Sequence, residues 1–198
     1  MKKIILAALL AAPLLASAAT ELVTNGSFEA NAIGNGSWSI FNSLTGWTGA
    51  PNIELRNNVA GAAFAGSNYV ELDTTGNSGM YQNIATTAGE HYTLSFAFSA
   101  RPNTGNTNDI NVFWNGALVA ANAGSNPTGA HQWQVFNFDV IGAAGSSQLK
   151  FAAAGASDAL GGSLDAVSVV RAVPEPETYA MMLAGLGLVG FLARRRKA

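Results

Sequence analysis

The chain has 198 residues, of which 48% are hydrophobic and 11% are charged, and it contains no cysteine. The lack of cysteine excludes disulfides, thiol catalysis, zinc–thiolate sites and iron–sulfur clusters. Residues 20–173 carry four basic and ten acidic side chains, a formal net charge of −6, and the other six basic residues lie in the two end segments. Nucleic acids and anionic membrane surfaces are bound through clustered Lys and Arg, so we expect residues 20–173 to bind neither.

The first 19 residues have the three parts of a secretory signal peptide. Met1–Lys3 is basic, Ile4–Leu15 is an apolar run, and Ala16–Ala19 supplies small residues. This order predicts export and removal of residues 1–19 by signal peptidase. The alternative, a retained helix, is disfavoured because the apolar run is too short to span a bilayer.

Residues 20–172 are predicted to form one all-β domain. Large apolar residues alternate with small or polar ones in HYTLSFAFSAR (91–101), NDINVFWNG (108–116) and QWQVFNFDV (132–140). This period of two is typical of strands, and Asn115-Gly116 is a hairpin-turn signal. SQLKFAA (147–153) and SLDAVSVV (163–170) add two more strands, and no long amphipathic helix is visible. About nine to eleven short strands predict an antiparallel β-sandwich, or jelly roll.

A set of short motifs runs through this domain in a recognisable order. The motifs are LVTNGSFE (22–29), GW (46–47), NYVELD (68–73), YQNI (81–84), AGEHYTLSF (88–96) and LDAVSV (164–169). Their order resembles the galactose-binding-like jelly rolls found among carbohydrate-binding modules and related cell-wall proteins. The resemblance implies the fold more directly than the ligand, because this fold hosts sugar binders, adhesins and purely structural modules.

The resemblance also implies a structural calcium ion between the first and last strands. The matching carboxylates are Glu29 and Asp165, and backbone carbonyls would complete the oxygen ligands that calcium needs. Relatives often have two adjacent acids where this chain has Leu164-Asp165, so one ligand is in doubt. The alternative is that Glu29 and Asp165 cap loops or pair with Arg171.

Sugar binding requires aromatic faces for stacking and polar groups that bond to hydroxyls. The candidate ligand-binding residues are Trp38, Trp114, Arg56, Arg101 and Asn115. Trp47 and Trp133 fit core positions of the resembled pattern, so packing is the favoured role for both. The two arginines are alternatively explained by ion pairs with Glu54 or Asp109.

The C-terminal segment, residues 173–198, has three parts of its own. Pro174, Glu175 and Pro176 precede an uncharged stretch, Thr178–Ala193, and then the basic run Arg194, Arg195, Arg196 and Lys197. The stretch is a marginal transmembrane helix, and the basic run would hold its end in the cytoplasm. The segment resembles the PEP-CTERM sorting signal of Gram-negative bacteria, which implies processing by an exosortase, a membrane transpeptidase associated with exopolysaccharide and biofilm. The alternative is an anchor that is never cut.

Together these features predict a protein that passes through the inner membrane to the cell surface or extracellular matrix. There it would bind or organise carbohydrate; the alternative is a structural matrix or adhesion protein with no discrete sugar site. Enzyme activity is not expected, because no Gly-x-Ser-x-Gly motif occurs and His91 and His131 are far apart in sequence. Glu71 and Asp73 share a strand face, yet glycosidase chemistry needs carboxylates on both sides of a cleft.

Overall fold

A computed structural model of the chain describes residues 19–104, 108–121, 129–172, 183–187, 189 and 194–195. Within it, Thr20–Ala172 forms one compact unit. The predicted signal peptide lies outside the described residues except for residue 19, and so do Pro174, Glu175, Pro176 and Arg196. Residues 183–187, 194 and 195 are helical and exposed. In the part of the chain that the structure describes, no helix has the length and apolar character needed to cross a membrane.

The compact unit is built from ten strands. They are β1 (Trp38–Leu44), β2 (Trp47–Asn57), β3 (Asn68–Glu71), β4 (Gly79–Thr86), β5 (His91–Ser99), β6 (Ile110–Trp114), β7 (Ala117–Ala121), β8 (Gln134–Ile141), β9 (Gly145–Ala153) and β10 (Ser163–Arg171). Every strand pair is antiparallel, and the order is β7-β6-β9-β4-β2-β3-β10-β5-β8, with β1 paired to β2. The predicted all-β antiparallel sandwich is confirmed.

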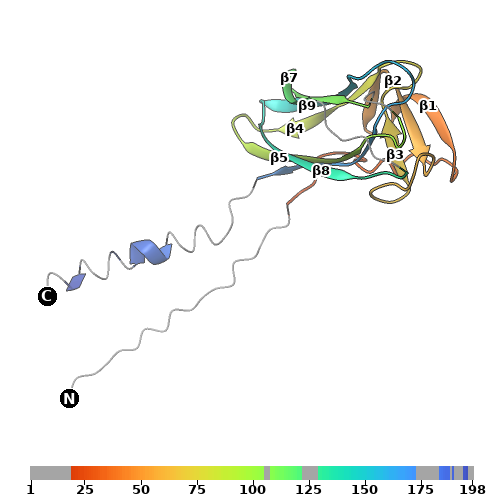
Figure 1. The fold of residues 1–198 in the computed structure, drawn as a ribbon. Helices are drawn as coiled ribbons and strands as arrows, with labels where there is room; N and C mark the ends of the chain where they lie inside the picture. The colour runs from red at the N-terminus through yellow and green to blue at the C-terminus, as the bar shows by residue number, and fades with distance from the viewer. Residues whose placement is uncertain are drawn as a thin grey trace. The chain divides into compact units, whose positions relative to one another are not determined.

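Two layers face each other, as Figure 1 shows. The β4 layer contains β7, β6, β9 and β4, and the β5 layer contains β3, β10, β5 and β8. Strand β2 belongs to both, because Thr48 and Gly49 pair with β4 while residues 54–57 pair with β3. Each layer therefore has one face on the core and one outer face, on which side chains of alternate residues point away from the core.

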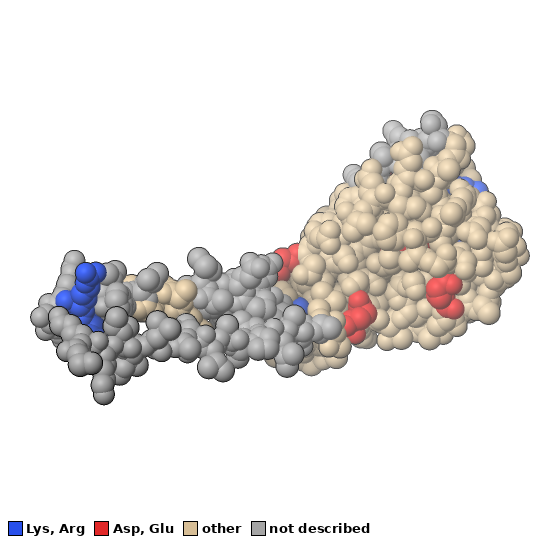
Figure 2. Space-filling model, turned by 90° about the horizontal axis from the view of Figure 1, so that it is seen from below, with Lys and Arg blue, Asp and Glu red and all other residues tan. Residues whose placement is uncertain are grey.

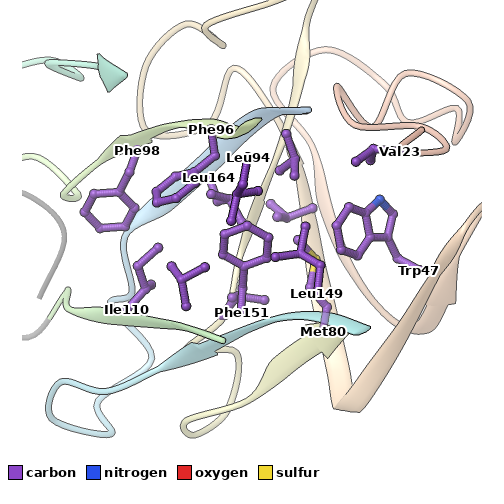
Figure 3. Packing of buried hydrophobic residues seen from close by; sticks show 14 of the residues in the cluster. Val23, Trp47, Met80, Leu94, Phe96, Phe98, Ile110, Leu149, Phe151 and Leu164 are labelled. Atoms are coloured by element: carbon purple, nitrogen blue, oxygen red, sulfur yellow. The ribbon is translucent and has the colours of Figure 1, made fainter. Parts of the chain in front are cut away.

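The core lies between the layers. Phe96 and Phe98 of β5 point toward Phe151 of β9 and Ile110 of β6 in Figure 3, and the Phe96 and Phe151 ring centroids are 5.3 Å apart. Trp47 closes one end: it is only 2% exposed, and its indole nitrogen donates to the Asn25 carbonyl at 3.1 Å. Its predicted packing role is confirmed.

The first segment of the unit runs beside the last strand. The Leu22 amide donates to the Val169 carbonyl at 3.0 Å, and the Val167 amide donates to the Gly26 carbonyl at 2.9 Å. A Cβ atom on Gly26 would lie 1.8 Å from the Val167 carbonyl oxygen, so only glycine permits this approach. The LVTNGSFE motif thus places Glu29 near the same end of the sandwich as Asp165.

Candidate functional site

The outer face of the β5 layer carries a row of buried charges, and we call it the covered face. Glu54 of β2 lies opposite Glu71 of β3, and Ser163 of β10 follows on the other side of Glu71. Arg56 bonds to Glu54 through Nε at 2.6 Å, and its Nη2 forms an ion pair with Glu71. Arg101 approaches the same Glu71 carboxylate at 3.8 Å. The candidate ligand-binding residues Arg56 and Arg101 are therefore held by internal carboxylates.

Burial dominates the chemistry of Glu71. It raises the pKa of the Glu71 carboxyl to about 8, although the positive charge of Arg56 acts in the opposite direction. The Glu71 Oε1 atom also accepts a 2.6 Å hydrogen bond from the Gly161 amide. The Asp73 carboxylate also accepts backbone hydrogen bonds: its Oδ2 accepts from the Asp158 amide at 2.9 Å and from the Leu160 amide at 3.3 Å. Both carboxylates are fully buried under residues 158–161 and hold that connection in place.

Glu29 and Asp165, the candidate calcium ligands, hold a different connection. Glu29 Oε1 accepts from the Ser67 amide at 2.8 Å and the Asn68 amide at 2.6 Å. Asp165 Oδ2 accepts from the Phe64 and Ala65 amides, both at 2.9 Å. The two carboxylates thus hold residues 64–68, which are the second half of the link between β2 and β3 and the first residue of β3. Burial raises the pKa of the Asp165 carboxyl to about 6, against the lowering effect of these amide donors.

The hydrogen bonds of Glu29 and Asp165 favour loop capping over calcium binding. Calcium takes about six to eight oxygen ligands, whereas the atoms directed at both carboxylates are amide N–H groups. Among the described residues, no group of three or more His, Asp or Glu side chains could hold a metal. The alternative role as loop caps agrees with the hydrogen bonds, while calcium binding itself stays a prediction. Arg171, the other suggested partner of Asp165, is instead paired with Glu90 at 2.6 Å.

The tryptophans divide differently from the sequence interpretation. Trp38 is 54% exposed and lies opposite Arg56 in the β1–β2 pair, so it remains available for a ligand. Trp114 is only 5% exposed, and its indole nitrogen donates to the Ile141 carbonyl at 2.7 Å. The suggestion that Trp114 offers a stacking face is therefore wrong. Its alternation with Ile110 and Val112 had placed it on the core side of β6.

Trp133, predicted to pack in the core, lies on the covered face and is half-buried. Its indole nitrogen donates to the Ala62 carbonyl at 3.1 Å, and its ring contacts Phe64 with centroids 6.1 Å apart. Phe64 is 47% exposed. We call Phe64 and Trp133 the aromatic pair. Sequence reasoning missed Phe64 and assigned Trp133 to packing.

The aromatic pair rests on a rigid base. The rings of His131 and Trp133 are 4.9 Å apart, and the Tyr69 ring lies 5.0 Å from His131 and 6.0 Å from Trp133. With neutral His131, Nδ1–H donates to the Ala62 carbonyl and Nε2 accepts from the Ser163 hydroxyl, each at 3.0 Å. Burial lowers the pKa of His131, which favours this neutral form. Figure 2, which views the molecule from below, shows few exposed Lys, Arg, Asp or Glu side chains on this side.

Asn115 has a local structural role. It lies in the predicted Asn115-Gly116 turn between β6 and β7, where both residues have positive φ. Its side-chain oxygen accepts from the Gln148 amide at 2.9 Å, and its side-chain nitrogen donates to the Ser147 hydroxyl at 3.1 Å. The side-chain amide is thus used to connect the turn to β9.

A groove lies at the opposite side of the sandwich, beside β4. Its volume is about 440 Å³, and it is lined by Leu22, Thr24, Gly46, Thr48, Tyr81, Gln82, Asn83 and Ala85. The Gln82 side chain fixes one wall, because it accepts from the Thr24 amide at 2.7 Å and donates to the Thr24 carbonyl at 3.0 Å. The size is within the range of about 300–1,000 Å³ that is usual for small-ligand sites.

These features define a single-domain antiparallel β-sandwich with accessible aromatic side chains on one outer face and a groove on the other. Residues 172–197 match the family described as the PEP-CTERM protein-sorting motif. The predicted sorting signal is thereby confirmed at the level of the motif.

Three further similarities each cover more than two thirds of the chain. The chain is 31% identical over 156 residues to the multifunctional-autoprocessing repeats-in-toxin of Vibrio cholerae serotype O1; the match covers 75% of this chain and 3% of that protein. A family 35 carbohydrate-binding module from Clostridium thermocellum is 19% identical, with 69% of this chain and 99% of the module covered and a TM-score of 0.47. TmCBM61 in complex with β-1,4-galactotriose is 16% identical, with 77% and 99% covered and a TM-score of 0.48. The chain spans only a small fraction of the length of the toxin that it matches.

Proposed function

We propose that this chain is an exported, exosortase-processed protein of the cell surface or extracellular matrix whose sandwich binds carbohydrate. The observation that carries the binding proposal is the aromatic pair, Phe64 and Trp133, which is solvent-accessible and fixed in orientation. Sugars expose apolar C–H faces that stack on such rings. A ring held in place before binding loses little conformational freedom when the sugar arrives.

Trp38 supports the same proposal from the other end of the covered face. It lies on β1, the strand beside β2, and its side chain is more exposed than that of Phe64. The side-chain amides of Asn35 and Asn58 are joined by a 2.9 Å hydrogen bond and are exposed nearby, on the connections next to β1 and β2. Aromatic rings with neighbouring amides are the usual components of a sugar site. We therefore propose Trp38 as a second contact.

The sorting motif supports the cellular part of the proposal. A motif of this kind at residues 172–197 fits an exported precursor that is held briefly at the membrane and then cut. The net charge of −6 on residues 20–173 disfavours nucleic acid and anionic lipid as partners. We propose the exopolysaccharide of the producing bacterium as the ligand, and biofilm as the setting.

The rival function is structural. Trp133 and His131 both bond to the Ala62 carbonyl, so the same aromatic residues also hold the connection between β2 and β3. A matrix protein with no sugar site would need these contacts for stability alone. The rival therefore predicts that changes in the aromatic pair alter stability without altering retention on a polysaccharide.

A glycan array tests the proposal most broadly. The chain should bind one class of polysaccharide above background, and Trp133→Ala should weaken that signal. Trp133→Phe is the matched variant, because it keeps a stacking ring but loses the hydrogen bond to Ala62. If Trp133→Phe loses binding as fully as Trp133→Ala, or if the parent binds nothing, the structural rival is favoured.

A further inference from the structure

The outer face of the β4 layer carries its own row of side chains, and we call it the open face. Tyr81 of β4 lies opposite Thr48 of β2 on one side and opposite Lys150 of β9 on the other. Lys150 in turn lies opposite Phe113 of β6. Residues directly opposite in a sheet project to the same side. Thr48, Tyr81, Lys150 and Phe113 therefore form one row across four strands.

This row points away from the core. Met80 and Phe151, the neighbours of Tyr81 and Lys150 in sequence, are fully buried, and so is Val112 beside Phe113. Tyr81, Lys150 and Phe113 themselves are half-buried, and Thr48 is exposed. The open face thus presents two aromatic rings on either side of one ammonium group.

A second row runs alongside and contains amides. Asn83 of β4 lies opposite Gln148 of β9, both side chains are exposed, and Gln148 Nε2 is 3.4 Å from Asn83 Oδ1. The groove begins at Tyr81 and Asn83 and extends toward Thr24 and Thr48. Rings, amides and a groove of ligand size therefore adjoin one another on this face.

Lys150 differs from the other cations of residues 20–173. Arg56, Arg101 and Arg171 each lie within ion-pair distance of a carboxylate. Lys150 makes no ion pair with any described carboxylate; its ammonium group lies 5.8 Å from the centroid of the Phe113 ring. Residues 20–173 have a net charge of −6. Among the described residues of that segment, Lys150 is the one Lys or Arg side chain that a negatively charged ligand could meet without displacing an internal partner.

We infer that the open face is a second saccharide-binding site, specific for sugars that carry a carboxylate. The sugar rings would contact Tyr81 and Phe113, the amides of Asn83 and Gln148 would bond to hydroxyls, and Lys150 would bind the carboxylate. Its residues are separate from the aromatic pair and from Trp38, and it points the opposite way. This inference goes beyond the proposed function, because it adds a site and names the charge of its ligand.

The test uses two ligands with the same backbone. The full chain, purified in mild detergent with a chelator present, is titrated with polygalacturonate and with fully methyl-esterified polygalacturonate. The parent should bind the carboxylated polymer more tightly. Lys150→Gln should reduce that preference by up to about fivefold, the upper end for an exposed ion pair. Added salt should reduce the preference in the parent.

Matched variants separate the site from general charge effects. Arg171→Gln removes one exposed positive charge that is already paired with Glu90, so it should leave the preference unchanged. The double variant Tyr81→Ala/Phe113→Ala should weaken binding to the carboxylated polymer, and Trp133→Ala should keep the preference even if it abolishes binding at the aromatic pair. The inference is overturned if the parent shows no preference, if Lys150→Gln keeps it in full, or if single-stranded DNA binds as tightly as polygalacturonate.

Discussion

The two outer faces of the sandwich use their charges in opposite ways. On the covered face, Arg56 is buried between Glu54 and Glu71, and Asp165 is buried against two backbone amides. On the open face, Lys150 is half-buried and unpaired among the described residues, beside a groove. Buried pairs are costly to disrupt, whereas an accessible cation costs little to remove. The difference indicates that charge stabilises the first face and is available for binding on the second.

The largest expected effect concerns the core that both faces share. Trp47→Ala should lower the free energy of unfolding by about 3–5 kcal/mol, because it removes a large ring that contacts Phe28 and Phe151. Denaturant unfolding would measure it. Leu118→Ala, at an exposed position of β7, is the control and should change stability by no more than about 0.5 kcal/mol. Similar losses in both variants would contradict the placement of the core.

The contrast between the faces is tested by two changes that each remove one positive charge. Arg56→Ala should cost about 3–5 kcal/mol, because it leaves Glu54 and Glu71 buried without their partner. Lys150→Gln should change stability by at most about 0.5 kcal/mol. Equal melting temperatures for the two variants would show that the charge network on the covered face is not stabilising.

The next prediction concerns calcium at the covered face. The Glu29 and Asp165 carboxylates already accept hydrogen bonds from backbone amides, so a chelator should leave the melting temperature unchanged. Asp165→Ala should cost about 1–3 kcal/mol, because the Phe64 and Ala65 amides lose their acceptor. A chelator-dependent melt together with bound calcium in elemental analysis would instead support the metal site suggested by the sequence.

A further expected effect on stability is a dependence on pH. Because the pKa of Glu71 is raised to about 8, the folded state binds more protons than the unfolded state between pH 4.5 and about 8. The free energy of unfolding should therefore fall as pH rises through this window. Asp165 acts in the same direction only up to about pH 6, and His131, whose pKa is lowered, acts oppositely below pH 6.5.

The interval from pH 6.5 to 8 thus isolates Glu71 among these three groups. Melting temperatures of the parent should decrease across it, and the slope should be smaller in Glu71→Gln. A parent melting temperature that stays constant across the interval, with the same result for Glu71→Gln, would mean that Glu71 is ionised in the folded protein throughout.

The sequence was sufficient for the parts of the fold that depend on local pattern. Alternation in residues 91–101 and 132–140 predicted β5 and β8, and the Asn115-Gly116 signal predicted the turn after β6. The same alternation also predicts the side on which two tryptophans lie. Trp133 falls on the side of β8 opposite Phe136 and Phe138, which pack against the core, and Trp114 falls on the core side of β6.

Other features depend on pairing between distant segments. Arg56 meets Glu71 because β2 and β3 lie in register, and Lys150 adjoins Tyr81 and Phe113 because β9 lies between β4 and β6. Phe64 lies in a Gly- and Ala-rich connection without periodic pattern. Its exposure follows only from the hydrogen bonds that the Phe64 and Ala65 amides donate to the Asp165 carboxylate. Register and loop placement of this kind are not encoded in any short stretch of sequence.

The central claim is that the aromatic pair binds carbohydrate, and affinity gel electrophoresis tests it most directly. The parent, Trp133→Ala, Phe64→Ala and Leu118→Ala are run through gels that contain the exopolysaccharide of the producing bacterium, after melting curves have shown that each is folded. The parent and Leu118→Ala should be retarded equally. Each variant of the aromatic pair should bind about fivefold more weakly, the loss expected from about 1 kcal/mol of stacking. Equal retardation of all four proteins, or none for the parent, would contradict the claim.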